Sequence, residues 1–144
     1  MSDAPDGAGA TSRCSKEPQH VRPSLRLCAA GLAVLRIVTA LLFILHGTQK
    51  IIGFPASDMT PPLFSLFGLA GIIEIVAGIL VLVGFFTRPA AFIAAGEMAV
   101  AYWMAHAPAN LFPAMNGGDA AILFCFVFLY LVFSGPGAWS INKQ

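Results

Sequence analysis

Two glutamates, Glu74 and Glu97, interrupt apolar stretches in which a charged side chain is unexpected. The first lies in LFGLAGIIEIVAGILVLVG and the second in RPAAFIAAGEMAVAYWMA. An ionisable side chain inside a membrane span is costly, and it commonly marks a proton relay or a ligand pathway. The groups that these two carboxyls face therefore decide what chemistry the chain can perform.

The overall composition places these segments in a membrane. The chain has 144 residues, of which 58% are hydrophobic and 10% are charged, whereas soluble domains carry about 25% charged residues. The mean hydropathy is +0.80, and a chain of this size cannot bury so much apolar surface in one small core. No basic patch with interleaved aromatic residues is present, which argues against binding of nucleic acid.

The three cysteines carry no recognisable metal or disulfide pattern. Cys14, Cys28 and Cys125 form no CxxC pair and no cluster with histidine. An odd number of scattered cysteines does not predict a disulfide framework, and the spacing required for a zinc site is missing. We therefore predict no metal site.

Breaks rich in proline and glycine divide the chain into four apolar stretches, at 30–50, 63–83, 88–106 and 118–135. Each stretch is close to the length of about 20 residues that crosses the hydrocarbon core as a helix. The predicted fold is all-α, a four-helix transmembrane bundle that forms one membrane domain over residues 26–144. Residues 1–25 are polar and contain three prolines, so they predict a disordered cytoplasmic tail.

The distribution of lysine and arginine predicts the orientation of the bundle. Four of the eight precede the first apolar stretch, Arg88 lies in the turn between the second and third, and Lys143 follows the fourth. In the loops at 49–62 and 107–118, Lys50 is the only lysine or arginine. Since cytoplasmic loops carry the excess of positive charge, we predict a multi-pass protein with both termini in the cytoplasm.

The depths of the polar residues predict a cluster. The outer ends of the four helices are taken at Lys50, Leu63, His106 and Asp119. With a rise of about 1.5 Å per residue, Glu97 then lies about 13 Å deep and Glu74 about 16 Å deep. Both carboxyls fall between His46, at about 6 Å, and Arg36, at about 21 Å.

Six residues make up the predicted buried polar cluster: Arg36, His46, Lys50, Glu74, Glu97 and Asp119. Because lipid offers no partner to a charge, such side chains turn inward and pair with one another. We expect Arg36 to pair with Glu74 or Glu97, and Lys50 to pair with Asp119. The cluster is either a site for protons or a quinone head group, or a set of ion pairs that only fixes the packing of the helices.

Three motifs resemble the DoxX family of bacterial membrane proteins. LRIVTALLFILHGTQKIIG (35–53) contains the family's arginine and Gly-x-x-Lys ending, here Arg36, Gly47 and Lys50. GLAGIIEIVAGILVLVGFFTRPAA (68–91) contains its glutamate, glycines and Thr-Arg turn, here Glu74, Gly78, Gly84, Thr87 and Arg88. GPGAWSIN (135–142) is similar to its C-terminal motif, although Asn142 stands where the family usually has aspartate.

The resemblance implies a four-helix protein of the bacterial inner membrane. The family is named for a membrane subunit associated with thiosulfate:quinone oxidoreduction. The implied function is therefore a membrane component of a quinone-linked or thiol- and sulfur-linked redox system, as a candidate oxidoreductase subunit. The alternatives are a small proton-coupled transporter and a non-catalytic membrane assembly module.

The resemblance assigns no catalytic residue, and the sequence contains no nucleotide or haem fingerprint that would identify a bound cofactor. Quinone is the one cofactor that the family suggests. The expected partners are the lipid bilayer and either a soluble oxidoreductase, which would bring its own redox cofactor, or further copies of the chain.

Overall fold

The computed structural model describes residues 21–56 and 62–142 as helices and their connections, with no strand in these ranges. The elements are α1 (Val21–Ile52), α2 (Leu66–Val83), α3 (Thr87–Ala101), the π-helical η1 (Tyr102–His106), α4 (Pro113–Asn116) and α5 (Asp119–Ser134). The prediction of an all-α fold is confirmed. Residues 1–20 of the predicted tail lie outside the described part of the chain.

Helix α1 begins earlier than the sequence predicted. Residues 21–25 were assigned to the tail, whereas α1 already begins at Val21. Pro23 lies in its first turn, where a proline is tolerated because the missing N–H would have no partner within the helix. The helix therefore extends, on its N-terminal side, past the apolar stretch that begins near residue 30.

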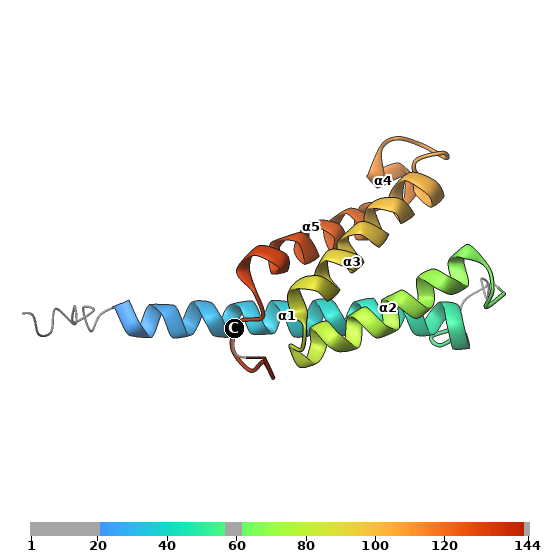
Figure 1. Cartoon of the computed structure of the whole chain (residues 1–144). Coiled ribbons are helices and arrows are strands. Elements are labelled where there is room, and N and C mark those ends of the chain that lie inside the picture. Colours follow the sequence, from blue (N-terminus) through green and yellow to red (C-terminus); the bar gives the residue numbers. More distant parts are fainter. Residues whose placement is uncertain (1–20, 57–61, 143–144) are drawn as a thin grey trace, which may run out of the picture.

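The helices pack as two antiparallel pairs, α1 with α2 and α3 with α5 (Figure 1). The α3–α5 pair leans away from the α1–α2 pair, so that the two pairs separate toward the end that carries α4. Between the pairs, Phe43 of α1 meets Phe128 of α5 edge to face, with ring centroids 4.7 Å apart. Both rings are fully buried, which places the core at this crossing.

Glycines bring the backbones of α1 and α2 close together. A Cβ atom on Gly47 would lie 2.7 Å from Cγ1 of Ile75 and 2.9 Å from the carbonyl oxygen of Gly71. A Cβ atom on Gly78 would lie 2.6 Å from Cγ1 of Ile44. Small residues at a helix interface permit this approach, and it sets the register that positions the polar side chains.

The connection from α2 to α3 is a tight turn. Gly84 ends α2 with φ of 73°, and Phe85 N donates to the carbonyl of Leu80 at 3.0 Å. This is the left-handed ending that glycine favours. Pro89 lies in the first turn of α3, where a proline is tolerated.

The predicted span at 88–106 is not one regular α-helix. After Ala101 the helix widens into η1, and the N–H of Ala107 donates to the carbonyl of Tyr102 at 2.9 Å. A bond across five residues defines a π turn. The extra residue in this turn changes which side chains face α2.

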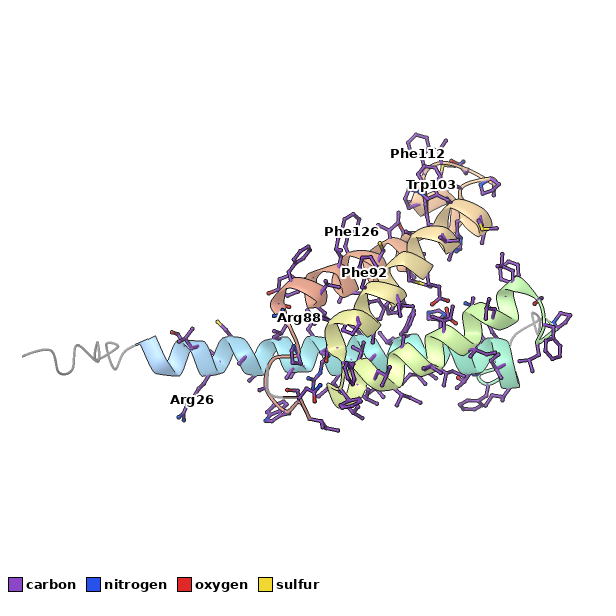
Figure 2. The ribbon with its side chains drawn as sticks, viewed as in Figure 1. Arg26, Arg88, Phe92, Trp103, Phe112 and Phe126 are labelled. Atoms are coloured by element: carbon purple, nitrogen blue, oxygen red, sulfur yellow. The ribbon has the colours of Figure 1, made fainter. Side chains whose placement is uncertain are left out.

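The outer surface of the bundle is strongly apolar. Large hydrophobic side chains are exposed on α1, α2, α3 and α5, and Figure 2 shows Phe112 and Phe126 projecting away from the helices. A surface of this kind is expected to face lipid. Among the described helices, Ser24–Ile52 and Leu66–Val83 have the length and apolarity of a membrane span, so the count of four spans stays a prediction.

Candidate functional site

An ion pair joins α1 and α2. Lys50 Nζ lies 2.5 Å from Oε1 of Glu74. Glu74 is 1% exposed, whereas the side chain of Lys50 is 26% exposed. The second carboxyl oxygen, Oε2, is buried and has no hydrogen-bond partner among the described residues.

This ion pair differs from the pairs expected from the sequence. The sequence predicted that Lys50 pairs with Asp119 and that Arg36 pairs with one of the two glutamates. Those expectations are wrong because they assumed that Lys50 is level with Leu63. The close approach of Lys50 to Gly71 shifts the register of α2 by about 12 Å along the helix axis. Glu74 therefore lies one turn from Lys50.

Arg36 is buried far from both glutamates, at the opposite end of α2. One guanidinium nitrogen donates to the carbonyl of Pro136 at 2.7 Å and another to the carbonyl of Trp139 at 2.8 Å. It also lies against Gly84. The C-terminal ends of α2 and α5 converge here, and such ends carry partial negative charge. Carbonyl dipoles therefore take the role that the sequence assigned to a carboxylate.

The segment 135–142 is fixed to the bundle by further backbone bonds. Ala138 N donates to Ala29 O at 3.1 Å, Ile141 N to Val83 O at 3.2 Å, and Asn142 N to Gly84 O at 3.2 Å. The C-terminal motif thus closes one end of the bundle around Arg36. Asn142 contributes its backbone to this closure.

Glu97 has no such partner. Both of its carboxyl oxygens are buried and make no hydrogen bond with any described residue. Glu97 does interact electrostatically with Glu74 and with Lys50, so the three groups from α1, α2 and α3 form one cluster. An isolated buried polar atom is expensive, and Glu97 therefore requires a partner that the described residues do not supply.

A cavity of about 720 Å³ lies beside this cluster, between α2 and the α3–η1 helix. Figure 1 shows these helices separating toward α4 in this region. Its polar lining comes from Lys50, Glu97 and His106. Its larger apolar lining residues include Leu66, Phe67, Ile73, Ile93, Val100 and Met104. An apolar cavity with a few convergent polar groups is the usual form of a small-molecule site.

His106 is a member of this site that the sequence analysis left outside the cluster. Its Nδ1 lies 3.0 Å from the carbonyl oxygen of Asn116, and its ring stacks on Tyr102 with centroids 6.5 Å apart. The π turn that brings His106 to the cavity has no signal in residue type or spacing, which is why the sequence did not reveal it.

Besides Arg36, two predicted members of the cluster lie outside the cavity. His46 is exposed, meets Phe124 edge to face at 5.6 Å, and lines a separate groove of about 330 Å³ between α1 and α5. Asp119 is exposed at the first position of α5, where a carboxylate interacts favourably with the helix dipole. The structure thus brings together Lys50, Glu74 and Glu97, and it separates Arg36 and Asp119 from them. His46 interacts electrostatically with Lys50, one turn further along α1, but lines the other groove.

Comparison with known proteins supports a membrane assignment. A protein of Haemophilus influenzae described as uncharacterized is 48% identical over 122 residues, which cover 78% of this chain and 89% of that protein. The inner membrane protein YphA of Escherichia coli is 30% identical over 125 residues, with the same coverage of each chain. No solved structure matches the chain.

The sequence profile of DoxX matches residues 31–107. This range contains Lys50, Glu74, Glu97 and the π turn with His106, so the cavity and its polar groups lie within the matched region. The profile match and the similarity to the inner membrane protein YphA support one assignment: the chain is a membrane protein and belongs to the DoxX family.

Proposed function

We propose that the chain is a membrane component of a redox system and that it binds a quinone in the cavity between α2 and the α3–η1 helix. The observation that carries the proposal is Glu97, which lines this apolar cavity together with Lys50 and whose buried carboxyl has no hydrogen-bond partner among the described residues. A ligand with polar atoms at one end and an apolar body would satisfy both features.

A quinone matches this site chemically. Its two carbonyl oxygens accept hydrogen bonds, and the Lys50 ammonium is a donor held in place by Glu74. The Glu97 carboxyl is placed to exchange a hydrogen bond or a proton with the head group. The isoprenoid tail would lie along Phe67 and Ile93, which line the cavity and are exposed on the outer surface of the helices.

Reduction of a quinone to a quinol takes two electrons and two protons. This chain would provide the membrane site, and a soluble oxidoreductase with its own redox cofactor would deliver electrons from a thiol or sulfur donor. The name of the relative YphA, an inner membrane protein, supports a location in the bacterial inner membrane. The alternative of a pure assembly module accounts for the Lys50–Glu74 pair, but it gives no role to the unpartnered Glu97.

The direct test is photolabelling of the purified protein with an azido-quinone in lipid nanodiscs. We expect labelled peptides from α2 and α3, and competition by unmodified ubiquinone. Glu97→Gln and Lys50→Met should each reduce labelling, whereas Asp119→Asn, which removes an exposed carboxylate outside the cavity, should not. Equal labelling of all four proteins, or none of the wild type, would contradict the quinone site.

A second test uses membranes. Membranes that lack the protein should reduce quinone more slowly with at least one thiol or sulfur donor, and the wild-type gene should restore the rate. Unchanged rates across a panel of such donors would remove the redox proposal. Proton-coupled uptake into proteoliposomes that depends on Glu97 would instead favour the transporter.

A further inference from the structure

We propose that His106 transfers protons between Glu97 and the water on the side of the 107–118 loop. The proposal rests on the proposed quinone site and specifies how protons reach it. Three observations carry it: the π turn that places His106 on the cavity, the bond that fixes its ring, and the unpartnered carboxyl that shares the cavity with it.

The π turn is what brings the two groups to one cavity. In a regular α-helix with 3.6 residues per turn, Glu97 and His106 are nine residues apart and would point in opposite directions. Across η1 the helix is wider, and the extra residue rotates His106 back toward the face of Glu97. Both side chains consequently line the same cavity. Single π turns of this kind are frequent at functional sites.

The bond to Asn116 prepares the ring for proton transfer. A carbonyl oxygen only accepts, so Nδ1 of His106 must be the donor in the 3.0 Å contact with Asn116 O. In the neutral ring this leaves Nε2 without a proton and able to accept one. The same bond persists in the imidazolium form. His106 can therefore gain and lose a proton at Nε2 without changing its position.

The other titratable groups that face His106 are few. Tyr102 stacks on it from η1, but the Tyr102 hydroxyl donates to the carbonyl of Leu111 at 2.8 Å. Lys50 of α1 and Glu97 of α3 line the same cavity, whereas α2 contributes apolar residues to the lining. The cavity has ample room for waters to bridge the two groups.

The proton steps balance with the redox reaction. The O–H bond of the protonated Glu97 carboxyl breaks as an O–H bond forms on a reduced quinone oxygen. The Glu97 carboxylate then takes the Nε2 proton of the His106 imidazolium, directly or through water, and His106 recovers a proton from the loop side. Two such cycles supply the two protons, and the thiol or sulfur donor supplies the two electrons and is oxidised.

His106→Asn is the sharpest test variant. The asparagine amide nitrogen replaces Nδ1 and still donates to Asn116 O, but nothing replaces Nε2. His46→Asn is the matched control, because it makes the same change at an exposed histidine that lines a different groove. Both are compared with the wild type as full-length protein in detergent.

The readout is the response of the Glu97 carboxyl to a pH jump, followed by the infrared C=O band that is absent in Glu97→Gln. We expect His106→Asn to slow this response on the order of a hundredfold, imidazole in solution to restore it, and His46→Asn to leave it unchanged. A wild-type rate in His106→Asn would overturn the proposal. So would a slow rate that imidazole does not restore, because the loss would then be structural.

Two further measurements complete the design. His106→Gln should show the same slow response, which guards against a folding defect peculiar to one variant. Azido-quinone labelling of His46→Asn should equal that of the wild type, because His46 lines a different groove. Absence of labelling in the wild type would contradict the quinone site, whereas the pH-jump rates decide separately on the proton route.

Discussion

Glu74 and Glu97 occupy adjacent helices, but their surroundings differ. Glu74 is compensated by Lys50 at 2.5 Å, whereas Glu97 forms no ion pair and no hydrogen bond with the residues that the structure describes. The first carboxylate thus holds Lys50 in place, and the second is the group left for a ligand or a proton. A substitution at each position should accordingly have a different consequence.

Lys50→Met should destabilise the protein, because it leaves Glu74 buried without a compensating charge. Breaking a buried pair costs about 3–5 kcal/mol. Because Lys50 is partly exposed, we expect a loss of about 3 kcal/mol. The free energy of unfolding by titration with SDS measures this loss. Asp119→Asn serves as the control and should stay within about 0.5 kcal/mol of the wild type.

The double variant Lys50→Met with Glu74→Gln should recover much of that stability, since no uncompensated charge then remains. The two single losses would therefore not add. Strictly additive losses would show that the ion pair does not form in the folded protein.

Glu97→Gln should leave stability almost unchanged, because no bond of Glu97 to a described residue is lost. The same substitution should reduce quinone labelling and abolish the infrared band used above. A large fall in the free energy of unfolding, measured by the same SDS titration, would mean that Glu97 has a structural partner and would weaken its assignment to a ligand site.

At the scale of elements, the seam of glycines between α1 and α2 sets the register on which the ion pair depends. Gly47→Ala would place a Cβ atom 2.9 Å from the backbone oxygen of Gly71 and 2.7 Å from Ile75, and the backbone cannot give way cheaply. We expect a loss of about 1–3 kcal/mol in the free energy of unfolding. Gly31→Ala is the matched control on the same helix, because its Cβ atom would meet nothing within 4 Å.

Arg36 holds the 135–142 segment against the helix ends. Arg36→Met removes charge-assisted bonds worth about 1.5–3 kcal/mol each, so the segment should open at least about tenfold more often. The maleimide labelling rate of Ser140→Cys, in a chain without the three native cysteines, measures this opening. Arg26→Gln, at an exposed arginine that projects from α1 (Figure 2), should leave the rate unchanged.

The sequence predicted the elements better than their contacts. Apolar stretches and proline breaks located α2, α3 and α5 closely, because burial in lipid demands long apolar helices. The pairing of Lys50 and Glu74 was missed because it depends on the register between α1 and α2, which glycine packing determines. Arg36 was predicted to pair with a carboxylate, because residue types alone do not reveal backbone carbonyls at helix ends as its partners.

Across the whole molecule, charge and polarity are separated between the two ends. Arg36 and the closed 135–142 segment occupy one end, whereas Lys50, Glu97 and His106, which line the cavity, lie toward the other. The connections at 53–65 and 107–118 contain no lysine or arginine, and the charge of Lys50 is neutralised by Glu74. The positive charge that could orient the bundle is therefore concentrated at the end that carries Arg26 and Arg88.

This asymmetry predicts a C-terminus in the cytoplasm and the 107–118 loop on the outer side, since lysine and arginine near a membrane are retained in the cytoplasm. The bond between Ala138 and Ala29 keeps the 135–142 segment at the same end as the start of α1. A green fluorescent protein fused after residue 144 should fluoresce in bacterial cells, and alkaline phosphatase inserted at Asn110 should be active. Active phosphatase fused at the C-terminus would show that the orientation is the reverse of the predicted one. Protons for the cavity would then enter through His106 from the cytoplasm.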